Sequence, residues 1–228
     1  FEVIEYIKKV NIDLPIHLLG HSMGSFISLK YAQNYGDEIN TLILSGSAYN
    51  NGLAVKVGAL LASIITKSKG RRYQSKLIHN LVMGRYNKKF KPNRTKADWL
   101  SRDNKVVDDY INDKYCGTVF SVSYYKDLLN SFSPLYSSLN LIPDELPIYL
   151  FSGDDDPVGD QGKGITILFK ELKKVKLIYN KYIEFGSRSI QWFAFLVGWE
   201  LIRLVFRYIL LIDKDKYLHY NKNNKKEG

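Results

Sequence analysis

The chain has 228 residues, of which 45% are hydrophobic and 25% are charged, and its formal net charge is +10. This composition excludes a largely disordered chain, and the length suits one large domain or a core with an inserted segment. The single cysteine, Cys116, excludes a disulfide within the chain and is typical of a reducing compartment.

The first ten residues form a charged amphipathic segment, and we expect a helix there because Val3, Ile4 and Ile7 share one face. The segment lacks the apolar stretch of a secretory signal, so we expect a cytoplasmic protein. The chain does not begin with methionine. We therefore expect it to start inside a longer gene product.

An apolar strand candidate at residues 16–19 runs directly into Gly20-His21-Ser22-Met23-Gly24. This G-x-S-x-G pattern is typical of a nucleophile elbow, a sharp turn that lifts a serine hydroxyl above the end of a sheet. Helical spacing predicts a helix over residues 25–35, directly after the motif. We expect both glycines to be required, because the strained turn leaves no room for side chains two residues before and after Ser22. A chance match to this short pattern is the alternative, and the strand and helix around it argue against that.

A second strand is predicted over residues 41–44. Alternation of strand, helix and strand indicates an α/β fold with parallel strands and right-handed crossovers. Apolar spacing then predicts helices over 53–65, 76–83, 97–110 and 121–129. A block of helices inserted into an α/β pattern is expected to form a cap over the active-site end of the sheet. We therefore divide this part of the chain into a core, residues 1–49 and 141–188, and a helical cap, residues 50–140.

The positive charge is concentrated in the predicted cap. Between Glu38 and Asp98 the sequence has 12 lysines and arginines and no acidic residue. Such a field attracts anionic surfaces or substrates, and salt weakens the attraction. A solvated face in a lysine-rich sequence explains the pattern equally well. We do not expect nucleic-acid binding, because no known recognition motif accompanies the charge.

Residues 147–153 indicate a strand that runs into the acidic loop Asp154-Asp155-Asp156-Pro157, and a helix over 164–173 and a strand over 176–179 follow. A serine nucleophile needs a base, and the base needs a carboxylate to orient it. On an elbow-type sheet the acid follows a later strand, in the chain order serine, acid, histidine. We predict Asp156 as this acid, because a residue before proline is held extended. Asp154 is the next candidate, and a loop that merely carries three aspartates is the alternative.

Four motifs together resemble those of α/β-hydrolases of the monoacylglycerol lipase and lysophospholipase type, a group also labelled serine aminopeptidase S33. They are the elbow at residues 20–25, Asp98-Trp99-Leu100-Ser101-Arg102-Asp103, Tyr115-Cys116-Gly117, and the acid loop from Gly153 to Gly164. The resemblance covers roughly residues 1–185 and implies a partial α/β-hydrolase parallel sheet with an inserted helical cap.

The resemblance also implies an activity, the hydrolysis of an ester in a monoacylglycerol- or lysophospholipid-like substrate through an acyl-enzyme. By resemblance, Ser22 is the nucleophile, Asp156 is the triad acid and the Met23 amide is an oxyanion donor. We expect no cofactor, and no cluster of side chains has the spacing of a metal site. The expected partners are a small acyl ester or lipid and, as an open alternative, an anionic membrane surface. Peptide substrates are disfavoured, because the long basic stretch offers no acidic pocket for a substrate amine.

Two parts of the family pattern are absent. Only one helix precedes the elbow strand, where such enzymes have about four strands and the loop with the second oxyanion donor. We therefore expect a sheet that lacks one half and has an open edge at residues 16–19. The histidine is also missing, because Phe185-Gly186-Ser187-Arg188-Ser189 stands where the family has its histidine loop.

Four histidines are left as candidates for the base. His21 belongs to the elbow, His17 to the strand before it and His79 to the cap. Only His219 follows Asp156, and it lies in the polar tail at residues 214–228. Loss of the base from a serine protease costs roughly 10⁶ in turnover. We therefore expect an impaired enzyme whose base is unassigned.

The apolar run at residues 190–212 is long enough to span a bilayer, which takes about 20 residues. Three charged residues interrupt it on one helical stripe: Glu200, Arg203 and Arg207. Placing each charge at the middle of a membrane costs about 2.5–3.5 kcal/mol, which offsets the free energy gained by inserting the apolar side chains. A helix packed on the sheet or lying in a membrane interface fits this stripe better.

A reading-frame change after Arg188 is a third explanation, since it removes the histidine and creates the unusual tail together. We assign residues 189–213 to an apolar helix. As an alternative function we keep a non-catalytic membrane-surface binding protein that uses the basic cap and this helix.

Overall fold

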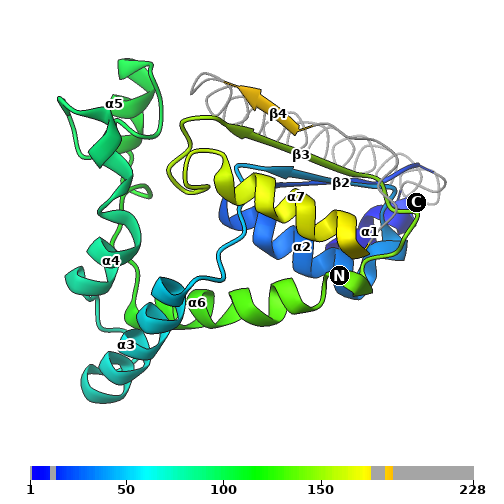
Figure 1. Ribbon diagram of the computed structural model, residues 1–228, viewed down its shortest axis with the longest axis horizontal. Helices are drawn as coiled ribbons and strands as arrows, with labels where there is room; N and C mark the ends of the chain where they lie inside the picture. Colours follow the sequence, from blue (N-terminus) through cyan, green and yellow to red (C-terminus); the bar gives the residue numbers. More distant parts are fainter. Residues whose placement is uncertain (1, 11–13, 176–182, 187–228) are drawn as a thin grey trace, which may run out of the picture. The chain divides into compact units, whose positions relative to one another are not determined.

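The computed structural model describes residues 2–10, 14–175 and 183–186 (Figure 1). The chain divides into two units, residues 1–191 and 192–228, and every described residue belongs to the first. The predicted strand at 176–179, the apolar helix at 189–213 and the polar tail lie outside the described residues.

Four parallel strands form one sheet in the order β1-β2-β3-β4. They are β1 (His17–His21), β2 (Thr41–Ser45), β3 (Ile148–Gly153) and β4 (Ile183–Gly186). Because neighbouring strands run in the same direction, their carboxyl ends meet at one edge of the sheet. In the described part of the chain, β1 pairs only with β2 and forms a border of the sheet. The prediction of a parallel α/β sheet is confirmed.

Of the described helices, three accompany the sheet: α1 (Glu2–Val10), α2 (Met23–Tyr35) and α7 (Lys163–Val175). α2 connects β1 to β2, α7 follows β3, and both run alongside the strands (Figure 1). When strand order follows chain order, right-handed crossovers place the connecting helices on the same face of the sheet. The buried side chains of these elements form the main core, which includes Leu29, Leu42, Leu150 and Leu168.

Between β2 and β3 the chain forms four helices: α3 (Leu53–Lys69), α4 (Lys76–Met83), α5 (Asn104–Asn112) and α6 (Val122–Ser137). Three short 3-10 helices are η1 (Gly36–Glu38), η2 (Tyr86–Phe90) and η3 (Leu139–Leu141). We call residues 50–140 the helical insert. It has its own small hydrophobic cluster, formed by Ala62, Ile78, Val122 and Tyr125. α6 joins this cluster to the main core, which its later residues Leu129, Phe132 and Leu135 enter.

Two predicted helices have different bounds in the structure. The helix expected over 97–110 begins only at Asn104, because the Asp98 carboxylate accepts hydrogen bonds from the Arg94 and Thr95 amides and holds a turn there. The helix expected over 121–129 continues to Ser137 and passes Pro134. Burial of its later apolar side chains outweighs the hydrogen bond that an internal proline removes. No described helix combines the length and the apolar character that crossing a bilayer requires.

Candidate active site

Ser22 lies between β1 and α2 in a backbone conformation that residues other than glycine rarely adopt, with φ 52° and ψ −120°. Its amide donates a hydrogen bond to the Ser45 carbonyl at the end of β2, at 2.9 Å. Its carbonyl accepts hydrogen bonds from the Ser25 amide at 2.9 Å and from the Ser25 hydroxyl at 2.6 Å. Strain of this kind persists only where the surrounding structure fixes it. The sharp strand-to-helix turn expected from the sequence is therefore present.

The two glycines of the motif have different surroundings. A Cβ atom on Gly20 would lie 2.4 Å from the Gly24 carbonyl oxygen and 2.5 Å from the Ser28 hydroxyl, so the strand and the helix approach closely here. A Cβ atom on Gly24 would meet nothing within 4 Å. The expectation that both glycines are sterically required is therefore wrong for Gly24, whose side-chain position faces open space.

The three consecutive aspartates after β3 also differ. Asp154 is exposed. Asp155 is half-buried and forms an ion pair at 2.7 Å with Lys89 of the helical insert, with Arg102 at 3.6 Å. Asp156 is only 1% exposed. A buried carboxylate is rare without dedicated partners, so Asp156 is the aspartate whose position the fold controls.

The Asp156 carboxylate is held from two sides. The Ser152 hydroxyl donates to Oδ2 at 3.1 Å, and the Val158 amide donates to Oδ1 at 2.9 Å. A Cβ atom on Gly46, directly after β2, would lie 3.4 Å from Asp156 Oδ2. Asp156 and Ser22 thus both follow the carboxyl ends of strands, at the same edge of the sheet.

Two of the three described histidines, His21 and His79, contact other side chains. His21 Nδ1 lies 2.9 Å from the buried Ser45 hydroxyl, and burial lowers the pKa of His21 because its charged form loses hydration. His79 Nδ1 lies 2.8 Å from the Tyr125 hydroxyl in the helical insert. His17 is exposed on β1. Within the described ranges, no histidine is hydrogen-bonded to the Ser22 or Asp156 side chain, and His219 lies outside them.

Ser22 borders a cavity of about 370 Å³ between the core and the helical insert. The elbow contributes Ser22, Met23 and Phe26, and the acid loop contributes Pro157 and Val158. The inner sides of α3, α4 and α6 supply most of the remaining wall, with Val55, Gly58, Leu81, Val82, Leu129 and Phe132. A mostly apolar wall with few polar groups is typical of a site for an apolar ligand.

Tyr86 of the helical insert lies near the acid loop. It lines the cavity, and its ring lies 4.9 Å from that of Trp99. Burial raises the pKa of Tyr86 to about 12, and the nearby Asp156 carboxylate contributes to the rise. The same short helix, η2, carries Lys89, which pairs with Asp155. The insert therefore places a neutral phenol in the wall of the cavity, within electrostatic range of Asp156.

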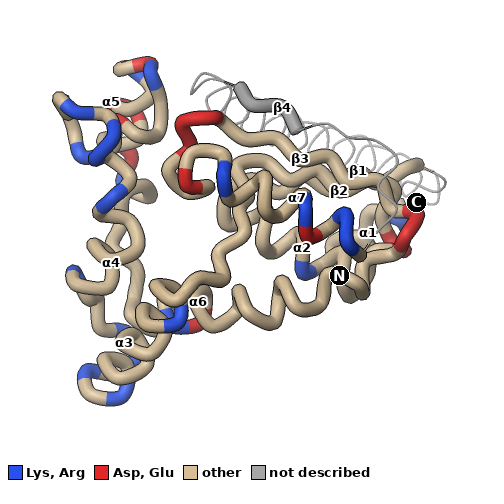
Figure 2. Tube along the Cα trace, viewed as in Figure 1, with Lys and Arg blue, Asp and Glu red and all other residues tan. Residues whose placement is uncertain are grey.

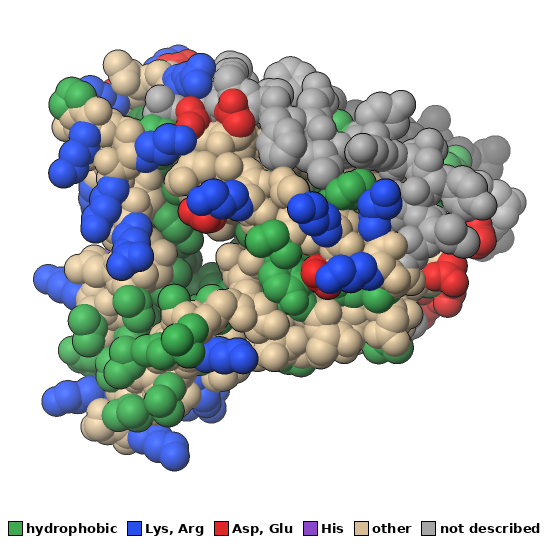
Figure 3. All heavy atoms as spheres, in the orientation of Figure 1, with side chains coloured by type: hydrophobic (Ala, Val, Ile, Leu, Met, Phe, Trp, Pro, Cys, Tyr) green, Lys and Arg blue, Asp and Glu red, His purple; other side chains and the backbone are tan. Residues whose placement is uncertain are grey.

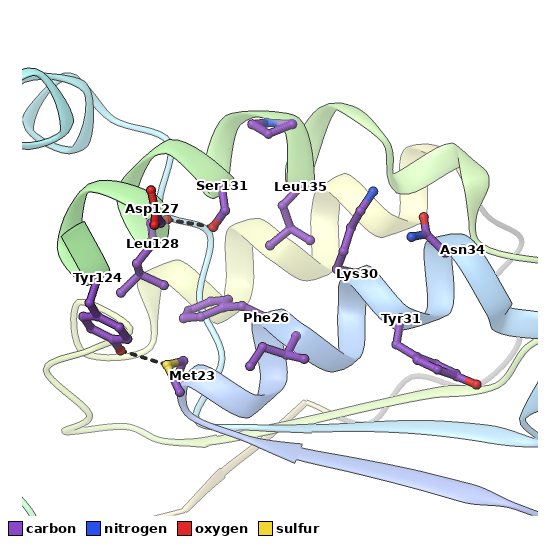
Figure 4. Close-up of a pocket in the computed structure, with 12 residues that line it drawn as sticks. Met23, Phe26, Lys30, Tyr31, Asn34, Tyr124, Asp127, Leu128, Ser131 and Leu135 are labelled. Carbon is purple, nitrogen blue, oxygen red and sulfur yellow. Dashed lines mark hydrogen bonds between the residues drawn. The ribbon is translucent and has the colours of Figure 1, made fainter. Parts of the chain in front are cut away.

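A second hollow lies outside the cavity, as a groove of about 610 Å³ between α2 and α6 (Figure 4). The Tyr124 hydroxyl of α6 donates a hydrogen bond to the Met23 sulfur at 2.8 Å (Figure 4). Both hollows are lined by Met23, Phe26, Tyr124 and Leu128. These four side chains therefore separate the groove from the cavity that Ser22 borders.

Ser45, Ser152 and Tyr86 were not predicted from the sequence. The signal for Ser152 was readable, since it is a buried-strand serine four residues before the acid. Ser45 and Tyr86 gave no such signal, because their contacts join segments far apart in the chain. Among the residues that the structure describes, no three His, Cys, Asp or Glu side chains group as metal ligands would.

Residues 1–182 match the Hydrolase_4 family, described as serine aminopeptidase, S33. The chain belongs to this family. The resemblance drawn from the four sequence motifs is thereby confirmed. No curated protein matches the chain.

Solved structures with the same fold include esterases and lipases. A thermostable carboxyl esterase from Bacillus coagulans is 23% identical with a TM-score of 0.70, and the match covers 80% of this chain and 59% of that one. A lipase in an open form is 20% identical with a TM-score of 0.68, covering 82% and 62%. A Paleococcus ferrophilus monoacylglycerol lipase is 17% identical with a TM-score of 0.55, covering 82% and 64%. These likenesses show a partial α/β-hydrolase fold, and the chain spans less than two thirds of each structure's length.

Proposed function

We propose that the chain carries the nucleophile and the acid of a serine hydrolase that cleaves carboxylic esters. The observation that carries this proposal is the cavity itself. Ser22, on its strained turn, and Pro157 and Val158, next to the buried Asp156, line the same apolar space. The proposed nucleophile and the residues that follow the proposed acid thus border one substrate-sized space.

In the proposed reaction, the Ser22 hydroxyl oxygen attacks the acyl carbonyl carbon and a base takes its proton. The alcohol leaves with a proton, and water then cleaves the acyl-enzyme to release the acid and restore Ser22. The Met23 amide is the proposed oxyanion donor. It is the first amide of α2, where the helix dipole favours negative charge. Asp156 orients the protonated base from its fixed, buried position.

The apolar wall supports an acyl chain as the part of the substrate that the cavity receives. The carboxyl esterase and monoacylglycerol lipase that share the fold support esters of the monoacylglycerol or lysophospholipid type. In this account residues 50–140 are a cap that closes the site, and residues 1–49 and 141–188 are the catalytic core. The ion pair between Lys89 and Asp155 supports this arrangement, because it fastens the insert to the acid loop.

No residue is assigned as the base of the proposed site. His21 and His79 are engaged with Ser45 and Tyr125. Ser187 stands where the resemblance expects histidine. We therefore propose that the chain turns esters over slowly, and that a small diffusible base restores the reaction. Imidazole is suited to this because it is the side-chain group that is missing and is small beside a cavity of about 370 Å³.

The test measures hydrolysis of p-nitrophenyl butyrate by the full chain and by Ser22→Ala, each with and without imidazole. Imidazole cleaves this ester by itself, so the quantity compared is the excess rate over the Ser22→Ala protein in the same buffer. We expect a small excess without imidazole and a rise with its concentration. Equal rates for the two proteins at every imidazole concentration would contradict the proposal. A high excess rate without imidazole would show that the chain supplies its own base, and His219→Ala then tests whether that base is His219.

A further inference from the structure

α3 exposes its large apolar side chains and buries its small ones. Leu53, Val57, Leu60 and Ile64 recur four, three and four residues apart on one face of the helix, and each is between 46% and 78% exposed. The face turned inward carries Gly58, Ala59 and Ala62. A Cβ atom on Gly58 would lie 3.2 Å from a methyl group of Leu129, so close contact with α6 demands small residues on the inner face. That contact explains the buried face, and it gives no reason for the exposed leucines and isoleucine.

α4 carries two further exposed leucines. Leu77 and Leu81 are one helical turn apart and are 65% and 45% exposed. A methyl group of Leu81 lies 3.6 Å from the position of a Cβ atom on Gly58, on the inward face of α3, so α4 adjoins α3 at that side. We call these side chains the α3–α4 surface: Leu53, Val57, Leu60, Leu61, Ile64, Leu77 and Leu81. Hydrophobic side chains gather over α3 in Figure 3, and Lys and Arg side chains surround them.

Basic residues border the α3–α4 surface. They are Lys56, Lys67, Lys69, Arg71, Arg72 and Lys76, and all six are exposed. Figure 2 shows where lysines and arginines lie along the chain trace. Within the described part of the chain, none of the six forms an ion pair. The dipole of α3 favours cations in its last turn, at Lys67 and Lys69. It does not account for Arg71 and Arg72 in the following loop, and Lys76 opens α4 at the end where a cation is disfavoured.

We propose that the α3–α4 surface docks on an anionic lipid bilayer. Its leucine and isoleucine side chains would enter the boundary between headgroups and acyl chains, and its lysines and arginines would contact lipid phosphates. An exposed apolar patch with a charged border marks an interaction site. Because this border is positively charged, it favours a negatively charged partner. A second copy of the same surface would bring like charges together. Charge complementarity therefore favours a negatively charged membrane over self-association.

The docked surface adjoins the cavity. Leu81 belongs to both, and Val55 and Val82 line the cavity from the inner sides of the same two helices. If Ser22 acts on a lipid ester, which rests on the proposed function, docking places the cavity wall against the source of that lipid. The substrate class selected by docking is an acyl ester that resides in an anionic membrane.

The test is co-sedimentation of the full chain with vesicles of phosphatidylcholine alone or of phosphatidylcholine with phosphatidylglycerol, at low and high salt. We expect binding to the anionic vesicles at low salt and its weakening at high salt. The triple variant Lys67→Gln, Arg71→Gln, Arg72→Gln should lower the partition coefficient by about a hundredfold, given the typical contribution of each cation. Leu60→Gln with Ile64→Gln should also lower it. All five positions are exposed, so these variants should fold.

A matched control is Ile167→Gln with Lys170→Gln on α7, where both side chains are also exposed. This control and Ser22→Ala should bind vesicles like the wild type, so binding is read separately from hydrolysis. Equal binding by the wild type and the α3–α4 variants would overturn the proposal and assign binding to another part of the chain. Equal binding to neutral and anionic vesicles would overturn it as well. Pelleting without vesicles that the same variants abolish would replace it with self-association.

Discussion

The Tyr124 hydroxyl donates a hydrogen bond to the Met23 sulfur at 2.8 Å and so joins the helical insert to the first residue of the elbow helix. Met23 follows Ser22 directly, and its amide is the proposed oxyanion donor. Because both partners of this hydrogen bond line the cavity and the groove outside it, the contact also sets the wall between the two. The insert thus positions an element of the proposed site instead of merely covering it.

The first prediction concerns this contact. Tyr124→Phe should lower kcat/KM for ester hydrolysis in imidazole by roughly two- to tenfold, the equivalent of one ordinary hydrogen bond. The free energy of unfolding should change little, because this hydrogen bond is exposed to solvent. Tyr110→Phe is the control, since its hydroxyl accepts a hydrogen bond from the Gly117 amide within the insert. The role assigned to Tyr124 is wrong if both variants leave kcat/KM at the wild-type value.

The second prediction compares the two glycines of the elbow. Gly20→Ala should lower the free energy of unfolding by roughly 1–3 kcal/mol, because its Cβ would overlap backbone and side-chain atoms. Gly24→Ala should be neutral or raise that free energy by up to about 1 kcal/mol, because the new methyl group meets open space in a helix. Urea unfolding of both variants measures the difference. Equal effects would show that the close approach at Gly20 is not a constraint.

The third prediction separates the aspartates. Asp156→Asn should lower the imidazole-dependent rate by more than about tenfold, because an amide does not stabilise a protonated base as a carboxylate does. Asp154→Asn should leave that rate unchanged, since Asp154 lies in the same loop but is exposed. Hydrolysis of p-nitrophenyl butyrate by both variants at one imidazole concentration is the measurement. A larger loss with Asp154→Asn would transfer the role of acid to that residue.

The fourth prediction is a pH dependence of stability. Burial lowers the pKa of His21 below its ordinary 6.5 in the folded chain. Between the two pKa values the unfolded chain therefore binds more protons than the folded chain. The contribution of His21 to the free energy of unfolding is thus complete above pH 6.5 and is lost as the pH falls below it. His21→Gln should lose less stability than the wild type between about pH 7.5 and about pH 5. Thermal unfolding of the two proteins across that range is the measurement, and equal losses would contradict this role of the partly buried His21 ring.

Local signals predicted the elements of the fold well where the sequence itself encodes a boundary. α4 has the predicted bounds because Ser75 caps it, with its hydroxyl accepting a hydrogen bond from the Ile78 amide. The end of α6 was missed because Leu135 and Tyr136 are buried against the core, and that burial outweighs the local signal of Pro134. Tertiary packing thus decided the boundary that local rules placed too early.

The candidate site divides in the same way. Ser22 and Asp156 could be chosen as candidates from the sequence, since each lies in a motif that follows a strand. The contact of Tyr124 with Met23 joins residues 101 positions apart, and that of Lys89 with Asp155 joins residues 66 positions apart. Such contacts depend on how the insert packs on the core, and no local pattern encodes them. The sequence also did not predict that α3 exposes its large apolar side chains and buries its small ones. Helical apolar spacing predicts a helix, but it does not show which face is turned inward.

Labelling with a fluorophosphonate tests most directly whether Ser22 is an activated nucleophile. This probe reacts covalently with the serine of a hydrolase and needs no release of product. We expect the label to map to the peptide containing Ser22, imidazole to accelerate labelling, and Ser22→Ala to remain unlabelled. Equal labelling of the wild type and Ser22→Ala, or no labelling of the wild type in imidazole, would contradict the assignment of Ser22 as the nucleophile.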